Sequence, residues 1–217
     1  MAKILERIIS KPFEVAYLPL CRIYARYSMP DNEPADRFMT LLISIFFLHQ
    51  HRYWPHLKKP RSFSEKTFSR MRYDRNPLWT MLTDKLLVRD YVSKRGKASY
   101  LVPLLWSGDE PEDIPFDALP SSFVIKTNHG CGFNILVMDK TRLARKDALG
   151  KLKAWLGQNF CEDTYLGVAW AYKNIEPKVM VEEFLDDNGK APLDYKLFCY
   201  SGRAEYVLMT FDRHGDP

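Results

Sequence analysis

The spacing of apolar residues changes near residue 100. Before that point apolar residues recur every three or four positions, as in amphipathic helices, and after it they form short runs bounded by turn-forming residues. Helices followed by mostly hairpin-connected strands predict an α+β fold rather than a doubly wound parallel sheet. We expect strands at residues 101–106, 123–127, 135–139, 179–185, 194–200 and 204–211, and a helix at residues 144–158.

The first third of the chain is predicted to be helical. Residues 2–27 have a helical pattern that Pro12 and Pro19 should kink or divide. Pro34 suits the first position of the next helix, whose apolar run at residues 38–48 is shorter than the roughly 20 residues that a bilayer span needs. We expect this run to be buried, with a helix lying on a membrane surface as the alternative. Its apolar residues at helical spacing are Phe38, Leu41, Leu42, Ile45 and Leu48.

Two further helices are predicted before the strands begin. Ser62 and Glu65 have the spacing of a capping box, which would open a short helix that runs to Arg72. A helix over residues 83–95 is expected to end at Gly96, because glycine readily adopts the conformation that terminates a helix.

Charge is distributed unevenly along the chain. Residues 1–75 hold 14 Lys and Arg against 7 Asp and Glu, a net +7, so the remainder carries −2 of the overall +5. This bias is best explained by scattered, solvated surface charge, and binding to phosphates, an acidic polymer or an anionic membrane surface is the alternative. The Lys and Arg residues are too dispersed for a nucleic-acid-binding patch, and the sequence has no recognisable nucleic-acid-binding motif. We therefore divide the chain into a basic helical region, residues 1–75, and a second domain, residues 76–217.

The cysteines and the N-terminus indicate a cytoplasmic protein. The four cysteines are widely spaced and form no C-x-x-C pair, which suits a reducing compartment better than a disulfide-stapled secreted domain. Residues 1–20 lack the uninterrupted apolar core and the small-residue cleavage site of a signal peptide. We expect a cytoplasmic location, at the inner face of the membrane if the basic region binds there.

A strand, a glycine-containing loop and a second strand follow one another between residues 123 and 139. Lys126 stands near the end of the first strand, and Gly130 and Gly132 lie in the loop. Such a loop leaves backbone N–H groups unpaired, its glycines let a polyphosphate approach closely, and lysines supply charge for the phosphate oxygens. We expect a β-hairpin whose tip, residues 128–134, is exposed and is mobile without ligand.

Three other segments complete the pattern of a nucleotide site. Lys85 follows Thr83 and Asp84 at a helix start, an acidic segment at residues 182–185 can contact adenine through backbone groups, and Asp194 can accept hydrogen bonds from ribose hydroxyls. Each has a simpler explanation alone: Lys85 can pair with Asp84, and Asp194 can be a turn residue. Their occurrence in one order, within about 130 residues, favours a nucleotide site over four separate coincidences.

The stretch from residue 60 to residue 213 resembles the TupA-like ATP-grasp family, the teichuronopeptide-biosynthesis type. The phrases that carry the resemblance are RSFSEKTFSRMRYDRNPLW, TDKLLVRDYV, LPSSFVIKTNHGCGFNILVMDK, VMVEEFL and DYKLFCYSGRAEYVLMTFDR. It implies an ATP-grasp fold, in which two α+β subdomains with mostly antiparallel sheets enclose ATP. The roles that it implies are phosphate contacts for Lys85 and Lys126, a mobile loop for Gly130 and Gly132, an adenine hinge for Glu182, Glu183 and Leu185, ribose binding for Asp194, and catalytic contacts with the phosphates or an acyl-phosphate for Lys196 and Arg213.

The resemblance also implies a reaction and its cofactors. It implies a ligase that uses ATP and Mg²⁺ to join a carboxylate to an amine through an acyl-phosphate, with a uronic acid-bearing glycan and an amino acid as substrates. In such enzymes the carboxylates that hold magnesium lie on later strands, which we expect beyond Pro217. We therefore expect the C-terminal part of the domain to be missing, the metal ligands to be unidentified here, and the 217-residue chain to be inactive alone.

Three other classes of protein remain open at this point. One is a non-catalytic module that binds nucleotide or glycan, and another is a glycosyltransferase-like protein of the same pathway. The third is a basic structural protein at a membrane surface, which an amphipathic, lipid-bound first third would favour. A glycosyltransferase would normally carry a D-x-D triplet, which the sequence lacks. The five tryptophans, Trp79 and Trp170 among them, are expected in the core, with a carbohydrate-facing surface as the alternative.

Overall fold

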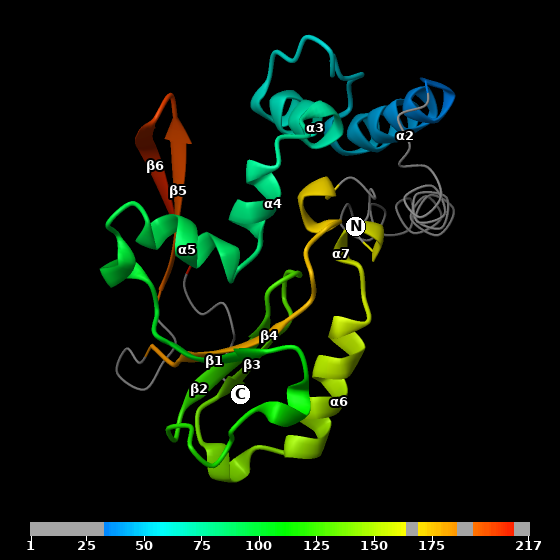
Figure 1. Cartoon of the computed structure of the whole chain (residues 1–217). Helices are drawn as coiled ribbons and strands as arrows, with labels where there is room; N and C mark the ends of the chain where they lie inside the picture. The colour runs from blue at the N-terminus through cyan, green and yellow to red at the C-terminus, as the bar shows by residue number, and fades with distance from the viewer. Residues whose placement is uncertain (1–32, 164–168, 186–192, 211–217) are drawn as a thin grey trace, which may run out of the picture.

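The computed structural model describes residues 33–163, 169–185 and 193–210. The helix expected over residues 2–27 and the predicted catalytic residue Arg213 lie outside the described residues. The described part contains helices and two antiparallel sheets, which confirms the α+β fold (Figure 1).

Helix α2 (Glu33–His51) packs against helix α3 (Phe63–Tyr73) through a small core of its own (Figure 1). The helix is where the sequence predicted it, but its buried face is not the expected one, because the helix is apolar on nearly every side and the pattern does not select a face. Phe38, Leu41 and Leu48 are exposed. The buried residues of α2 are Met39, Leu42, Ile43, Ser44 and Phe47. Across the described residues, no helix is long and apolar enough to cross a bilayer.

The capping box that opens α3 is confirmed. Ser62 Oγ accepts from Glu65 N at 3.1 Å, and the Glu65 carboxylate accepts from Ser62 N at 3.1 Å. The same carboxylate also accepts from Arg61 N at 2.6 Å and from His56 N at 2.9 Å. These donors, Arg61 N above all, lower the pKa of Glu65 to about 2. The loop between α2 and α3 is therefore tied to the first turn of α3.

Two short helices replace the single helix expected over residues 83–95. Helix α4 (Leu78–Thr83) was not predicted, and helix α5 (Leu87–Ser93) begins later than expected. Between them the buried Asp84 carboxylate accepts from Leu86 N at 2.8 Å and from Leu87 N at 3.2 Å, which starts the second helix in a new direction. Gly96, at φ +67°, follows α5 in the expected left-handed conformation.

The main sheet has four antiparallel strands in the order β1-β4-β2-β3. The predicted strands are confirmed, with shifts of a few residues at some ends. One face of the sheet packs against helix α6 (Arg145–Leu156), which runs alongside it in Figure 1. Their shared core includes Phe123, Ile125, Val181 and Leu152. The strands are β1 (Leu104–Gly108), β2 (Phe123–Thr127), β3 (Asn134–Val137) and β4 (Val179–Glu183).

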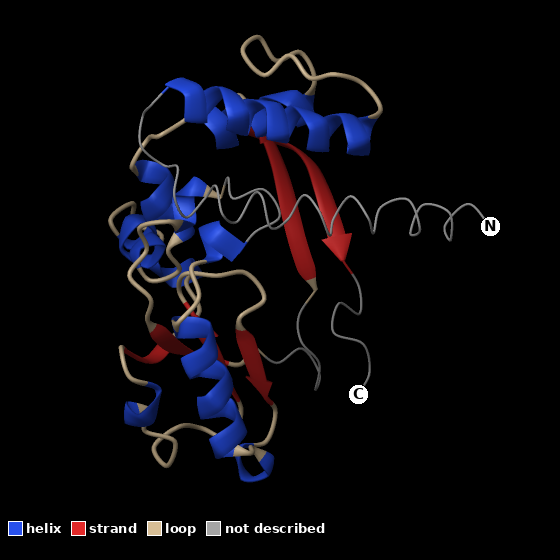
Figure 2. Ribbon diagram, turned by 90° about the vertical axis from the view of Figure 1, so that its right-hand side faces the viewer, coloured by secondary structure: helices blue, strands red, loops and turns tan. Residues whose placement is uncertain are grey.

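Strands β5 (Asp194–Tyr200) and β6 (Arg203–Thr210) form a separate two-stranded sheet. The predicted turn is confirmed: Ser201 has φ 50° and Gly202 has φ 81°, the pair of positive angles that a two-residue hairpin turn needs. The hairpin reaches up to the helical region in Figure 2, where Tyr200 contacts Phe63 with ring centroids 6.2 Å apart.

The remaining elements are short connections. Helix α7 (Phe160–Asp163) follows α6. Single 3₁₀ turns lie at η1 (Ala98–Tyr100), η2 (Pro111–Asp113), η3 (Lys140–Arg142) and η4 (Trp170–Tyr172).

Candidate functional site

Lys126 and Glu182 form an ion pair on the sheet face opposite α6. Side chains alternate between the two faces of a strand, and Ile125 and Val181 point to the α6 side, so Lys126 and Glu182 point away from it. Lys126 Nζ lies 2.5 Å from Glu182 Oε2. The Glu182 side chain is 9% exposed and that of Lys126 is 30% exposed, so the carboxylate is enclosed while the ammonium group stays partly accessible.

Arg89 joins this pair to helix α5. Its Nη1 donates to Glu182 Oε1 at 2.8 Å, and its Nη2 donates to the Val102 carbonyl at 2.6 Å. Arg89 therefore ties α5 to strand β4 and to the segment before β1. One buried carboxylate holds two cations in fixed positions. The electrostatic attraction within this group is stronger than in an exposed pair, because solvent screens it less.

Lys85 lies in the turn between α4 and α5, directly against the glycine-containing loop. Its Nζ donates to the carbonyls of Thr127 at 3.1 Å, Asn128 at 3.4 Å and Gly130, and its backbone N donates to Asn128 O at 3.3 Å. Burial lowers the pKa of Lys85, and the charge of Lys126 adds to this effect. The structure thus brings two predicted phosphate-binding lysines close to each other and to the loop.

The loop is anchored at its start by Asn128. Its Nδ2 donates to Glu176 O at 2.9 Å, and its Oδ1 accepts from Lys178 N at 2.7 Å. Its backbone N donates to Lys178 O at 3.1 Å. Asn128 is therefore bound to the segment that leads into β4, which holds the end of β2 beside that strand.

The prediction that the whole tip is exposed is wrong. Cys131 and Gly132 are exposed, but Asn128, His129 and Gly130 are buried. The physical reason is Phe133, the one bulky apolar side chain of the tip. Its ring stacks on Trp155 of α6 with centroids 5.3 Å apart and folds the tip back onto the core.

The structure explains why glycine occupies both position 130 and position 132. A Cβ atom at Gly130 would lie 2.2 Å from the Phe133 ring, so only glycine leaves room for that ring in this position. Gly132 has φ +79°, a left-handed conformation that side chains disfavour. The buried His129 ring lies 3.0 Å from Trp155 O, and burial lowers its pKa.

The predicted hinge, residues 182–185, comprises the last two residues of β4 and the two residues after it. Glu183 N donates to Pro103 O at 3.0 Å, Phe184 is buried and Leu185 is 47% exposed. The Glu182 side chain is engaged by Lys126 and Arg89, so only its backbone is left for a hinge role. Within residues 33–163, 169–185 and 193–210, the Leu185 N–H makes no hydrogen bond with another backbone group.

Two other predicted residues belong to the second sheet. Asp194 and Lys196 are two positions apart on β5 and form an ion pair with each other. Because β5 belongs to the separate hairpin, the structure places them on a different sheet from Lys126 and Glu182.

The described carboxylates do not fit a magnesium site. Magnesium takes oxygen ligands, mainly from carboxylates. Asp84 is used by backbone N–H groups and Glu182 by two cations. Nowhere in the described part do three or more His, Cys, Asp or Glu side chains form a group that could hold a metal.

Sequence reasoning missed three residues that shape the site. Arg89 is one of them, because its partner Glu182 lies 93 positions later, which no local pattern reveals. Asn128 and Phe133 are the others, and both lie within the tip that was predicted to be exposed. The role of Phe133 could have been predicted in part, because a large aromatic side chain in a polar glycine loop is usually buried.

Comparison with known protein families identifies the chain. A sequence model of the TupA-like ATP-grasp family matches residues 65–216, or 152 of the 217 residues. The match begins inside α3 and includes Lys85, Lys126, the glycine loop and the hinge. Comparisons with curated proteins and with solved structures find no match. The chain belongs to the TupA-like ATP-grasp family.

Proposed function

We propose that this protein binds ATP beside Lys85, Lys126 and the glycine loop, and uses it to activate a carboxylate for joining to an amine. ATP-grasp membership indicates an ATP-dependent function of the ligase type. The observation that carries the assignment of the site is the placement of Lys126, fixed by Glu182, next to Lys85 on the loop.

The two lysines suit a polyphosphate for different reasons. A lysine held by a glutamate on a sheet keeps its ammonium group in one position, as in other enzymes that contact the phosphates of ATP. Lys85 donates to neutral carbonyls, and an anionic phosphate oxygen is a stronger acceptor than a carbonyl. Phosphate can therefore replace the carbonyls at Lys85, which would free the loop at Gly130 and let its exposed half, Cys131 and Gly132, close over the phosphate.

The hinge and the hairpin provide the rest of the nucleotide site. The side chains of Phe184 and Leu185 offer an apolar wall, and the Leu185 N–H offers a donor for the adenine ring. In this proposal Gly130 and Gly132 form the phosphate loop, and the backbone of Glu182 and Glu183 forms the hinge. Asp194 binds the ribose, and Lys196 and Arg213 make the catalytic contacts. For Asp194 and Lys196, this role requires the β5–β6 hairpin to lie against the nucleotide.

The proposed reaction has two steps. A carboxylate oxygen attacks the γ-phosphorus, the bond to the bridging oxygen breaks, and ADP leaves. An amine then attacks the acyl carbon and phosphate leaves, which gives the amide. Lys85 and Lys126 lower the barrier to the first step by stabilising charge on the phosphate oxygens. The resemblance supports substrates of surface polysaccharide assembly, an acidic glycan and an amino acid. The widely spaced cysteines support a cytoplasmic location.

The test is calorimetric titration of the protein with ADP and ATP. Replacing Lys126 with Ala removes one charge-assisted contact, which is worth about 1.5–3 kcal/mol or roughly 10- to 150-fold in affinity. Lys85→Met should have an effect of the same size, whereas Lys140→Met is the matched control. Lys140 also donates to three carbonyls, those of Phe116, Asp117 and Leu119, but lies at the opposite end of the hairpin. Equal nucleotide affinity in all variants would refute the site.

A further inference from the structure

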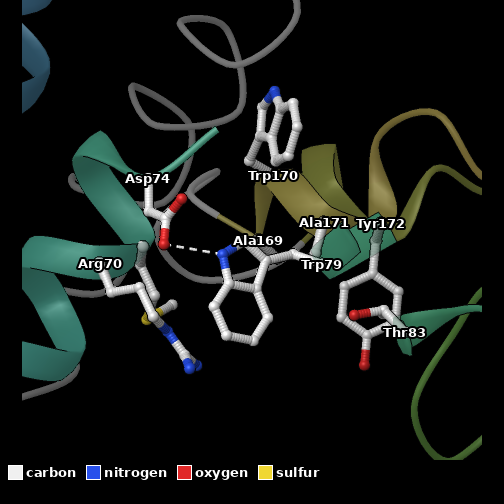
Figure 3. A pocket seen from close by; sticks show the side chains of 9 residues that line it. Arg70, Asp74, Trp79, Thr83, Ala169, Trp170, Ala171 and Tyr172 are labelled. Carbon is white, nitrogen blue, oxygen red and sulfur yellow. Dashed lines mark hydrogen bonds between the residues drawn. The ribbon is translucent and has the colours of Figure 1, made fainter. Parts of the chain in front are cut away.

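Two cavities border helix α3, and they differ in charge. In the first, of about 230 Å³, the guanidinium carbon of Arg70 lies 4.5 Å from the centroid of the Trp79 ring (Figure 3). The carboxylate of Asp74 lines the same cavity and accepts from Trp79 Nε1 at 2.7 Å. The second cavity, of about 530 Å³, lies between α2, the end of α3 and the loop that joins them. Lys58 and Lys59 line it, and no described residue of its lining is acidic.

The second cavity belongs to a strongly basic stretch of the chain. Residues 37–73 contain 8 Lys and Arg and a single acidic residue, Glu65. The Glu65 carboxylate is buried and accepts three backbone N–H groups, so its charge faces inward. Within the described ranges, the ammonium groups of Lys58 and Lys59 have neither a hydrogen bond nor a salt bridge. The cavity therefore presents these two cations to the solvent with no carboxylate to balance them.

The loop that carries the two lysines is anchored to the helices. Pro55 and Leu57 are buried, and Leu57 belongs to the core that α2 and α3 share. The residues beside them, Trp54 and Lys58, are exposed, and half of the Trp54 surface is accessible, at 50%. Because alternate residues of the loop are fixed inside, the indole and the lysines are held outward in defined positions.

Helix α2 adds an apolar stripe beside the cavity. Leu41, Ile45 and Leu48 have the spacing of one helix face, and the two leucines are exposed. The face that carries Ile43 packs against α3 instead. Leu41 lines the cavity together with Trp54 and the lysines, so apolar and basic groups meet on one surface. We call the side chains of Leu41, Leu48, Trp54, Lys58 and Lys59 the α2 surface.

The α2 surface lies at the end of the molecule away from the main sheet. Helices α2 and α3 and the loop that joins them are at the top of Figure 1, and strands β1 to β4 are at the bottom. Figure 2 shows the same separation from a second direction. A large partner can therefore cover the α2 surface while the main sheet, with Lys126 and Glu182, stays clear of it.

We infer that the α2 surface binds the face of an anionic lipid bilayer. Lys58 and Lys59 contact lipid phosphates, Trp54 lies at the level of the headgroups, and Leu41 reaches the acyl chains. Charge complementarity selects an anionic partner, and the apolar stripe selects lipid, because a soluble acidic polymer would leave the exposed leucines and the indole in water. This inference goes beyond the proposed ligase and does not depend on its nucleotide site.

The first experiment measures co-sedimentation of the 217-residue chain with vesicles. Vesicles of equal parts phosphatidylglycerol and phosphatidylcholine should bind the protein at least about 10-fold more tightly than vesicles of phosphatidylcholine alone. The double variant Lys58→Gln/Lys59→Gln should bind the mixed vesicles roughly 30-fold more weakly, at about 5-fold for each cation near an anionic surface. Lys146→Gln/Lys151→Gln is the matched control, because it removes two exposed lysines from α6, beside the main sheet, and it should leave binding unchanged. Equal losses in the two double variants, or equal binding to both kinds of vesicle, would overturn the inference.

A second experiment separates a bilayer from a soluble polyanion. Mixed vesicles with bromine atoms on the acyl chains should quench part of the tryptophan fluorescence of the bound protein, and Trp54→Phe, which keeps an aromatic ring, should lose that quenching. Equal quenching of the two proteins would show that Trp54 does not enter the bilayer, and the inference would fail. It would also fail if immobilised heparin bound the protein as tightly as the mixed vesicles do, because the α2 surface would then be a site for an acidic polymer.

Discussion

The ion pair of Glu182 with Lys126 and Arg89 offers a quantitative test of the site. Replacing Glu182 with Gln keeps the size of the side chain and removes its charge. One amide oxygen can still accept from Arg89, but the amide NH₂ then faces Lys126, which leaves that ammonium group without its acceptor. Two cations would remain close together with no carboxylate between them.

The expected cost follows from the exposure of the three side chains. Breaking a fully buried pair costs about 3–5 kcal/mol. Glu182 is 9%, Arg89 15% and Lys126 30% exposed. Water can therefore hydrate the charges that lose their partner, which lowers the free-energy cost below that of a fully buried pair. We expect Glu182→Gln to lower the free energy of unfolding by about 2–3 kcal/mol, which for a chain of this length is roughly 4–12 °C in melting temperature.

Urea unfolding of the variants in a double-mutant cycle measures the coupling free energy between Glu182 and Lys126. We expect Glu182→Gln and Lys126→Met to couple by about 1–2 kcal/mol, because each removes a partner that the other needs. The control cycle uses Glu112→Gln and Lys153→Met, an ion pair of the same kind whose side chains are 47% and 59% exposed. That cycle should give a clearly smaller coupling, because solvent screens an exposed pair. If the two cycles give the same coupling, or if the Glu182 cycle is additive, the buried pair does not hold Lys126 in place.

Two further outcomes concern the loop and the cap. Gly130→Ala should destabilise the protein by about 1–3 kcal/mol, because the added Cβ would meet the Phe133 ring. Gly150→Ala is the control, because a Cβ at this position in α6 has open space and should be neutral or stabilising. Equal melting temperatures for the two variants would contradict the packing of Phe133. The pKa of Glu65 is lowered from 4.5 to about 2 in the folded protein, so its contribution to stability is complete above pH 4.5 and is lost as the pH falls toward 2. Stability measured from pH 5 to pH 2.5 should therefore decline less steeply in Glu65→Gln, and parallel profiles would show that Glu65 contributes nothing to acid unfolding.

Elements that depend on local interactions could be predicted from the sequence. The capping box at Ser62, the strands around the glycine loop and the turn at Ser201 and Gly202 all follow from residues within a few positions of one another. Backbone geometry and neighbouring side chains determine such features, so they form wherever the pattern occurs. The prediction that Lys85, Lys126, Gly130 and Glu182 belong to one nucleotide site came instead from the order of the segments along the chain and from the family resemblance.

Contacts between distant segments were decided only by the tertiary structure. The hydrophobic pattern of α2 did not reveal that Met39 and Phe47 are buried while Leu41 is exposed, because burial depends on which side α3 covers. Glycine spacing predicted an open loop tip, yet Phe133 reaches Trp155 and closes half of it. The ion pairs of the site join residues that are far apart in the sequence: Glu182 lies 56 positions after Lys126 and 93 positions after Arg89. Periodicity describes which residues share a face of one element, but only packing determines what that face meets.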